Sequence, residues 1–197
     1  DLIRAVAEEE RLCPHFEIAL QSGNDEVLRR MRRGYTADDF RRLAGRIREH
    51  VPEASLSTDI IVGFPGETEA QFGDTLRLVE EVGFDMIHIA KYSPRPGTAA
   101  AEAYADEVPA EEKERRRAAV DDLLREHLAR RHAGWKGRPL DVRVEGRRKG
   151  RWMGRTPNNV LVFTEDERDL HGRIVTVVPE WTGPYSLVGR VEEMGIA

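Results

Sequence analysis

Cysteine is nearly absent from this sequence, since Cys13 is the only one in 197 residues. A single thiol cannot form an internal disulfide, which indicates a reducing compartment such as the cytoplasm. It also excludes an iron–sulfur cluster held by three cysteines of this chain. Because isolated cysteines are usually small core residues, we expect Cys13 to be buried.

Long apolar runs are also missing, and no stretch approaches the ~20 residues that a membrane-spanning helix requires. The sequence therefore argues against a membrane protein. The opening segment DLIRAVAEEERL does not follow the pattern of a secretory signal. It lacks a starting methionine and already has a helical pattern, so we expect a piece of a longer protein whose N-terminal part precedes Asp1.

Charge is plentiful but unevenly distributed. Residues 1–135 carry 20 Lys and Arg against 27 Asp and Glu, whereas residues 136–197 carry 11 against 9. The first part is therefore acidic and the second slightly basic. This asymmetry indicates two domains, the second of which could meet an anion such as nucleic acid.

The first hundred residues alternate between apolar runs and helical patterns. Runs at 15–20, 56–64 and 86–93 read as strands, and Thr36 and Thr68 are placed to cap the helices between them. Strands that alternate with helices pair in parallel through right-handed crossovers. We therefore predict an α/β fold with three βα units, which is part of a parallel βα barrel or doubly wound sheet.

The last third of the chain has a different pattern. Residues 95–112 read as a connector and residues 110–133 as a highly charged helix. Beyond the helix the apolar period changes to two, and five short strands with turn residues between them follow. This pattern predicts a small all-β barrel of the OB-like kind. We accordingly expect domains at 1–134 and 135–197.

Small and polar residues stand where the three predicted strands end. Gln21 and Ser22 follow the first strand, the turn from Gly63 to Glu67 follows the second, and Tyr92 ends the third. Ligands of parallel sheets bind at this edge, and glycine lets the backbone approach them closely. The structural alternatives are that Gln21 and Ser22 cap a helix, that the glycines only turn the chain, and that Glu67 complements a helix dipole.

Three side chains elsewhere in the α/β part are open to two interpretations. Asp59 lies within an apolar strand, where a carboxylate requires a ligand or a neighbouring partner. Arg33 could clamp a carboxylate or phosphate, although such arginines commonly face solvent. His88 lies on the third strand, where a lone histidine is usually structural.

Basic residues surround an aromatic one in the segment EGRRKGRWMGRT. The cluster consists of Arg147, Arg148, Lys149, Arg151 and Arg155 around Trp152. Basic side chains neutralise phosphates and aromatic rings stack on bases, so the pattern is typical of RNA binding. Trp181 and Tyr185 add further flat surfaces. The alternative is an ordinary hairpin that displays Arg and Lys to water.

Taken together, the motifs are more specific than any one of them alone. LQSGNDEVLRRMRRGYT, STDIIVGFPGETEAQF and KYSPRPGTAA closely resemble the methylthiotransferase branch of the radical S-adenosylmethionine (SAM) enzymes. GRWMGRTPNNVLVF and WTGPYSLVGRV resemble the C-terminal TRAM domain of that family. The arginine of YSPRPGT, Arg95, is similar to the tRNA-modifying members, whereas the ribosomal-protein-modifying members tend to have an acidic residue there.

The resemblance implies conversion of N6-isopentenyladenosine beside the tRNA anticodon to its 2-methylthio derivative. In this family one 4Fe-4S cluster cleaves SAM, and a second cluster supplies the sulfur. The cysteines of both clusters have no counterpart here, because Cys13 matches a position outside both sets. We therefore expect no metal ligand and no catalytic residue in this chain, and no activity from the chain alone.

The resemblance also assigns roles to individual positions. The SAM pocket would take in the strand ends and nearby polar residues, namely Gln21, Ser22, Arg33, Asp59, Gly63, Glu67 and Tyr92. Arg95 and Thr98 fall on the substrate side, and the basic cluster would hold the tRNA anticodon stem-loop. The rival interpretations are a ribosomal-protein methylthiotransferase, a stand-alone RNA-binding module, and a generic α/β fold with a phosphate-binding turn.

Overall fold

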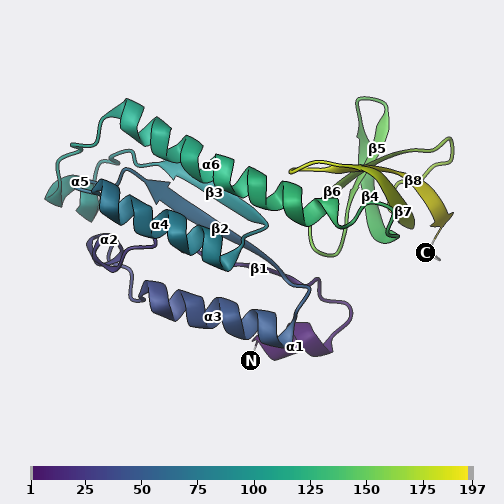
Figure 1. The fold of residues 1–197 in the computed structure, drawn as a ribbon, viewed down its shortest axis with the longest axis horizontal. Coiled ribbons are helices and arrows are strands. Elements are labelled where there is room, and N and C mark those ends of the chain that lie inside the picture. Colours follow the sequence, from purple (N-terminus) through teal and green to yellow (C-terminus); the bar gives the residue numbers. More distant parts are fainter. Residues whose placement is uncertain (1, 195–197) are drawn as a thin grey trace. The chain divides into compact units, whose positions relative to one another are not determined.

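The computed structural model describes residues 2–194 of the chain (Figure 1). They form two compact units, which we call the α/β unit and the barrel unit. The α/β unit runs from Phe16 to Leu124, and the barrel unit combines the chain up to His15 with the chain from Arg125 onward. No helix within residues 2–194 is both long enough and apolar enough to cross a membrane.

The α/β unit is built around a three-stranded sheet in the order β1-β2-β3, whose strands are β1 (His15–Glu17), β2 (Ser55–Val62) and β3 (Met86–Lys91). Its helices are α2 (Asp25–Arg30), α3 (Ala37–His50), α4 (Glu69–Val82) and α5 (Ala99–Ala103). β2 and β3 are parallel, and Gln21 bridges to Ile60 in the parallel sense. The prediction of a parallel α/β fold is confirmed.

The two longest helices within this unit start where the sequence predicted. Thr36 caps the start of α3 and Thr68 caps the start of α4, and each closes a capping box with the third residue of its helix, Asp39 and Gln71. Each box satisfies amide groups that a helix start would otherwise leave unpaired. Gly83 ends α4 in the left-handed conformation, with φ of 64°.

The first strand is shorter than predicted, because β1 ends at Glu17 rather than at residue 20. The Thr58 side chain replaces part of the ladder beyond it. Its hydroxyl accepts a hydrogen bond from the Leu20 amide at 2.9 Å and donates one to the Ile18 carbonyl at 2.6 Å. A second difference lies in the predicted connector, which contains the short helix α5.

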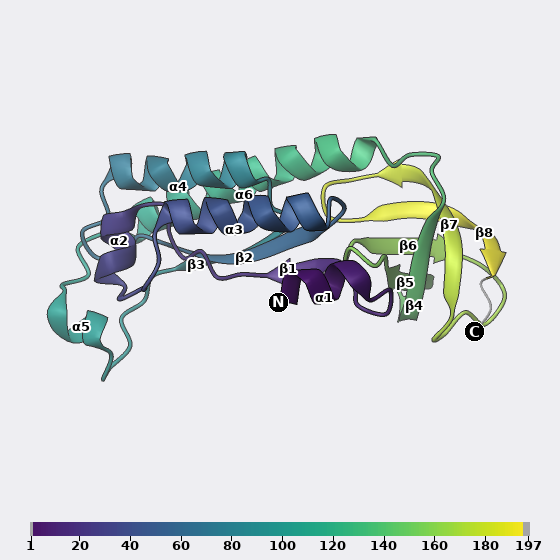
Figure 2. The same cartoon turned by 90° about the horizontal axis from the view of Figure 1, so that it is seen from below.

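One face of the sheet is covered by helices, and the other is open only toward the carboxyl end of β2, since Ser55 and Ser57 at its start are buried. Figure 2 shows α3 and α4 on the same side of the strands. On β2, Thr58, Ile60 and Val62 are buried, whereas the alternate residues Asp59 and Ile61 are only half-buried. Because successive strand residues point to opposite faces, Asp59 and Ile61 mark what we call the uncovered face.

Helix α6 (Ala110–Ala133) runs from the α/β unit into the barrel unit, which also contains α1 (Leu2–Glu8). The five strands are β4 (Leu140–Arg148), β5 (Arg151–Arg155), β6 (Leu161–Glu165), β7 (Ile174–Thr182) and β8 (Leu187–Met194). They form a closed barrel in the order β4-β5-β6-β8-β7, in which β6 and β8 are parallel and the other pairs antiparallel. The predicted small barrel is therefore present.

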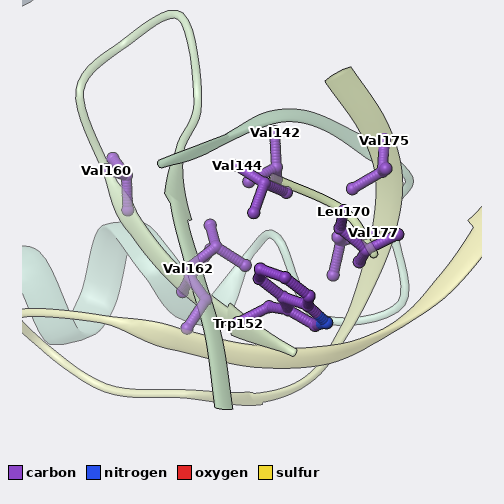
Figure 3. Close-up of a cluster of buried hydrophobic side chains, with 9 residues drawn as sticks. Val142, Val144, Trp152, Val160, Val162, Leu170, Val175 and Val177 are labelled. Carbon is purple, nitrogen blue, oxygen red and sulfur yellow. The ribbon is translucent and has the colours of Figure 1, made fainter. Parts of the chain in front are cut away.

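The barrel has its own apolar core (Figure 3). Its buried members are Val142, Val144, Trp152, Val160, Val162, Leu170, Val175, Val177 and Leu187. Gly154 and Gly189 let strands cross closely, since a Cβ atom on either would lie less than 2.5 Å from a neighbouring backbone oxygen. Cys13 is exposed, so the expectation that it lies in a core is wrong.

Candidate functional site

The predicted strand ends come together at one edge of the α/β unit. The Gln21 amide donates to the Asp59 carbonyl at 2.9 Å, and the Ile61 amide donates to the Gln21 carbonyl at 3.0 Å. The Tyr92 amide donates to the Val62 carbonyl at 2.9 Å. Backbone hydrogen bonds therefore tie all three strand ends into one continuous edge, where ligands of parallel sheets bind.

A cleft of about 390 Å³ opens on the uncovered face. Its polar lining residues are Gln21, Asp59 and His88, and its apolar lining residues are Ile60, Ile61, Ile89 and Ala90. Gln21 has a left-handed backbone, with φ of 66°, which is uncommon for a residue with a side chain. The structure thus brings together two predicted site residues, Gln21 and Asp59, and adds His88.

The other five predicted cofactor-site residues do not line this cleft, and Ser22 and Arg33 are two of them. Ser22 is fully buried, and its hydroxyl lies 3.4 Å from that of Thr75 and accepts from the Asn24 amide at 3.3 Å. It braces the start of α2, which is the capping alternative and not a surface for a ribose. Arg33 is exposed and lines a separate hollow with Asp25 and Tyr35.

Glu67 points into the protein, and only 1% of its side chain is exposed. Its Oε2 atom accepts from the Gly63 amide at 2.7 Å and from the Arg116 guanidinium at 2.8 Å. Burial raises the pKa of Glu67, although the Gly63 hydrogen bond and Arg116 act in the opposite direction. Glu67 is therefore a buried brace of its own turn.

The two glycines of this turn make room for cationic side chains of the same chain. Both have left-handed backbones, with φ of 68° at Gly63 and 69° at Gly66. A Cβ atom on Gly63 would lie 2.4 Å from Lys113 Cγ, and one on Gly66 would lie 2.6 Å from an Arg30 nitrogen. Lys113 and Arg30 therefore occupy the space that a side chain on either glycine would need, and approach of a ligand to this turn stays a prediction.

Gly63→Ala is expected to lower the free energy of unfolding of the α/β unit by about 1–3 kcal/mol, because a side chain is strained at this φ and meets Lys113. Urea unfolding followed by circular dichroism measures the change. Gly34→Ala is the matched control, because a Cβ atom there has nothing within 4 Å. Equal stability of the two variants would contradict this account of Gly63.

Tyr92 closes the edge at the end of β3. Its ring meets Phe64 edge-on, with centroids 5.1 Å apart, and its hydroxyl oxygen is buried with no hydrogen-bond partner among the described residues. Lys113 Nζ donates to the Tyr92 carbonyl at 3.1 Å and to both carboxylate oxygens of Asp106. This lysine, which no sequence motif indicated, anchors the edge from α6.

Arg95 and Thr98 lie in the loop that follows β3. The Thr98 hydroxyl donates to the Arg95 carbonyl at 2.8 Å and accepts from the Ala101 amide, so Thr98 caps α5. Arg95 is exposed. Thr98 therefore shapes this loop, and a contact of either residue with a substrate stays a prediction.

The basic cluster of the barrel is organised around a buried ring. Trp152 is only 6% exposed, its indole N–H donates to the Asp166 carbonyl at 3.1 Å, and the Arg147 guanidinium lies 4.0 Å from the ring centroid. A base could not stack on Trp152 unless this covering moved, so the predicted stacking role is not supported. Trp152 is a core residue that holds Arg147 in place.

The other cationic residues of the cluster differ in whether their side chains pair with neighbouring residues. Arg151 pairs with Glu165 at 2.7 Å, and Arg155 donates to Asn159 at 3.1 Å. Arg148 at the end of β4 and Lys149 in the turn that leads to β5 are both exposed. This turn is the part of the cluster best placed to meet a phosphate.

An apolar row crosses the outside of the barrel. The strand registers place Met153 opposite Phe163, Phe163 opposite Val188, and Val188 opposite Trp181. Trp181 is 55% exposed and the other three are half-buried. The sequence alone indicated Trp181 only as a further flat surface. The period-two alternation of β5 and β6 could have indicated that Met153 and Phe163 point outward.

Among residues 2–194, no group of three or more His, Cys, Asp or Glu side chains is arranged to hold a metal ion. An iron–sulfur cluster requires thiolate ligands, and the one cysteine of the chain is exposed and far from sufficient. The described residues therefore do not supply the ligands of an iron–sulfur cluster.

Comparison with known proteins shows which family this chain resembles. Residues 1–79 match the Radical SAM superfamily. A tRNA-2-methylthio-N(6)-dimethylallyladenosine synthase of Roseiflexus sp. (strain RS-1) is 46% identical over 191 residues, covering 95% of this chain and 40% of that protein. The protein of the same name from Chloroflexus aurantiacus is 47% identical, with 95% and 41% covered.

A third such synthase, from Herpetosiphon aurantiacus, is 42% identical over 193 residues, covering 96% of this chain and 44% of the relative. The chain thus spans less than half the length of these curated relatives. The resemblance to radical SAM methylthiotransferases of the tRNA-modifying branch is confirmed by these matches.

Proposed function

We propose that this chain is part of a tRNA methylthiotransferase that uses radical SAM chemistry to convert N6-isopentenyladenosine to its 2-methylthio derivative. One observation carries the proposal. The three strand ends meet at one edge beside an uncovered polar face, in a chain whose relatives are named for this reaction. The alternatives are a ribosomal-protein methylthiotransferase and a stand-alone RNA-binding module.

The proposed fold is a piece of a βα barrel followed by a TRAM barrel, with the boundary near residue 134. A barrel wall is a parallel sheet with helices on its outer face and ligand groups inside. The α/β unit has this character, since α3 and α4 lie on one face (Figure 2) and the other carries Asp59 and His88. Further strands would come from parts of the whole protein beyond this chain.

The polar groups at the strand edge are of the kinds that bind an adenosyl cofactor. Gln21 and Asp59 line the cleft, and Tyr92 at the end of β3 has a buried hydroxyl oxygen without a hydrogen-bond partner among the described residues. We assign contact with SAM to these three residues, and a bracing role to Ser22, Gly63 and Glu67. Bound at this edge, SAM would supply the radical chemistry of the reaction, and these three residues would hold its adenosyl part.

The thiolate ligands of that cluster, and of a second one for sulfur delivery, would lie elsewhere in the whole protein. The test is therefore made on the whole protein, as nucleoside mass spectrometry of tRNA after reaction with SAM and reductant. A 2-methylthio product on tRNA supports the proposal, and the 197-residue chain is the matched control expected to give none. Methylthiolation of a ribosomal protein instead would establish the rival enzyme.

The barrel unit is proposed to hold the anticodon stem-loop, in the cytoplasm where the single cysteine of the chain stays reduced. The turn of Arg148 and Lys149 would contact phosphates, with Arg147, Arg151 and Arg155 beside it. Because the structure buries Trp152, we transfer the stacking role to Trp181 on the apolar row. A stacked base is worth about 1–3 kcal/mol of binding free energy.

Reversing two charges with Arg148→Glu and Lys149→Glu is expected to weaken stem-loop binding and to reduce its salt dependence. Each lost phosphate contact lowers the slope of log affinity against log salt by roughly 0.7–0.9. Filter binding at several salt concentrations measures this slope. The control variant Arg42→Glu with Arg77→Glu reverses two exposed arginines of the α/β unit, which are 68% and 69% exposed. An unchanged slope in the hairpin variant would remove the proposed interface.

A further inference from the structure

The uncovered face carries a pair of hydrogen-bonding groups that the proposed function has not used as a unit. Asp59 and His88 are directly opposite each other in the register of β2 and β3. Paired residues of neighbouring strands point to the same face, and the strands lie about 4.8 Å apart. Asp59 is half-buried and His88 exposed, so both side chains are accessible from the cleft.

Apart from Gln21, the other residues that line the cleft around this pair are apolar. Ile61 and Ala90 occupy the next outward positions toward the carboxyl ends of the same strands and face each other in the register. The residues that line the cleft include neither Lys nor Arg. A phosphate or carboxylate would therefore find no cationic partner here, and beside Asp59 it would be repelled. The lining suits a neutral, flat ligand.

The hydrogen-bond donors and acceptors of the pair restrict the chemical class of the ligand further. A carboxylate only accepts hydrogen bonds, whereas an imidazole N–H donates one. Adenine presents the complementary pair on one edge, with an amino donor at N6 beside a ring-nitrogen acceptor. The Gln21 amide, which can donate and accept, completes the polar end of the cleft.

We propose that Asp59 and His88 together form a recognition site for an adenine ring, in which Asp59 accepts from the 6-amino group and His88 donates to a ring nitrogen. Ile61 and Ala90 provide the apolar floor on which the ring lies. The inference rests on the proposed function, since that function supplies two adenine-bearing ligands, the cofactor and the substrate nucleoside. The cleft volume of about 390 Å³ lies within the roughly 300–1,000 Å³ range of small-ligand sites.

The test uses nuclear magnetic resonance of the 197-residue chain, in which the His88 imidazole reports on its own site. Adenosine is expected to shift the His88 signals saturably. Purine riboside, which lacks the 6-amino group, is expected to bind about tenfold more weakly, because it leaves Asp59 without a donor. The His50 imidazole, exposed on α3, is the internal control and should not move.

Two variants test the pair. Asp59→Ala and His88→Phe are each expected to weaken adenosine binding about tenfold, and Asp59→Ala should also abolish the preference over purine riboside. His88→Phe keeps a flat ring, so unchanged binding in that variant would mean that the imidazole only stacks, which overturns its role as a donor. His50→Phe is the matched control for loss of a histidine.

Two further ligands identify the source of the adenine ring. Binding of N6-dimethylallyladenosine in preference to S-adenosylhomocysteine would assign the site to the substrate base, and the reverse preference to the cofactor. Shifts of the Gly63 and Tyr92 amides without a His88 shift would overturn the inference but leave the proposed cofactor edge intact. The absence of any shift at His88 and at the strand edge with all of these ligands would also overturn the inferred adenine site. The proposed function is tested separately, by the methylthiolation assay.

Discussion

Replacing Arg116 with methionine is expected to lower the free energy of unfolding of the α/β unit by about 3–5 kcal/mol. The Arg116 side chain is 5% exposed and that of its partner Glu67 is 1% exposed. Methionine fills a similar volume but leaves the Glu67 carboxylate buried without its counter-charge. The cost of an uncompensated buried charge far exceeds that of losing a surface ion pair.

The adjacent arginine gives the control for this variant. Arg115 is 51% exposed and pairs with Glu112 and Glu69, so Arg115→Met is expected to cost at most about 1 kcal/mol. The double variant Glu67→Gln with Arg116→Met should recover much of the loss, because a glutamine oxygen still accepts from the Gly63 amide. If the double variant is as unstable as Arg116→Met, the unpaired carboxylate is not the cause.

The pH dependence of the stability of Arg116→Met gives an independent test of the same ion pair. Burial raises the pKa of Glu67 above its unfolded value, and loss of Arg116 removes one of the groups that oppose this shift. A carboxyl group whose pKa is raised in the folded state binds a proton more tightly there than in the unfolded state. The loss of folding stability that the charged Glu67 causes is therefore relieved as the pH falls toward about 4.3, the pKa of an unperturbed glutamate. The stability deficit of Arg116→Met should therefore shrink between pH 7 and pH 5.

Replacing Trp152 with alanine is expected to lower the free energy of unfolding of the barrel unit by about 3–5 kcal/mol. The ring belongs to the barrel core (Figure 3), and its removal leaves a cavity among Val142, Val162 and other core side chains. It also removes the surface on which Arg147 rests. Trp152→Phe should recover a large part of the loss.

The distribution of tryptophan makes this experiment selective. Trp135, Trp152 and Trp181 all lie in the barrel unit, so tryptophan fluorescence during urea unfolding reports on that unit alone. Trp181→Ala is the matched control, because a side chain that is 55% exposed should change stability by less than about 0.5 kcal/mol. A Trp152→Ala variant of unchanged stability that bound RNA weakly would restore the stacking role to Trp152.

The fold could be predicted from sequence because its signals are local and repetitive. Capping residues such as Thr36 and Thr68, and the change of apolar period after residue 134, mark the elements directly. The end of β1 could not be placed this way. It depends on the Thr58 hydroxyl, which belongs to a strand some 40 residues away.

The site was harder to predict because the same residue types serve as ligand groups and as braces. Gln21 and Asp59 line a cleft as expected, but Glu67 and Ser22 turn inward toward partners on α6 and α4. Nothing in the local sequence reveals those partners, because Arg116 is 49 residues from Glu67. The position of Trp152 inside the barrel likewise depends on alternation along one strand, which a basic neighbourhood conceals.

The two sheets differ in whether they have edges. The barrel closes on itself through the parallel pairing of β6 with β8, so each of its strands has two neighbours. In the α/β unit β1 and β3 are outermost and each has one neighbour. Outermost strands are templates for backbone pairing with another chain. The barrel could therefore be transplanted onto another protein as a self-contained module, whereas the α/β unit would tend to recruit additional strands along its flanks.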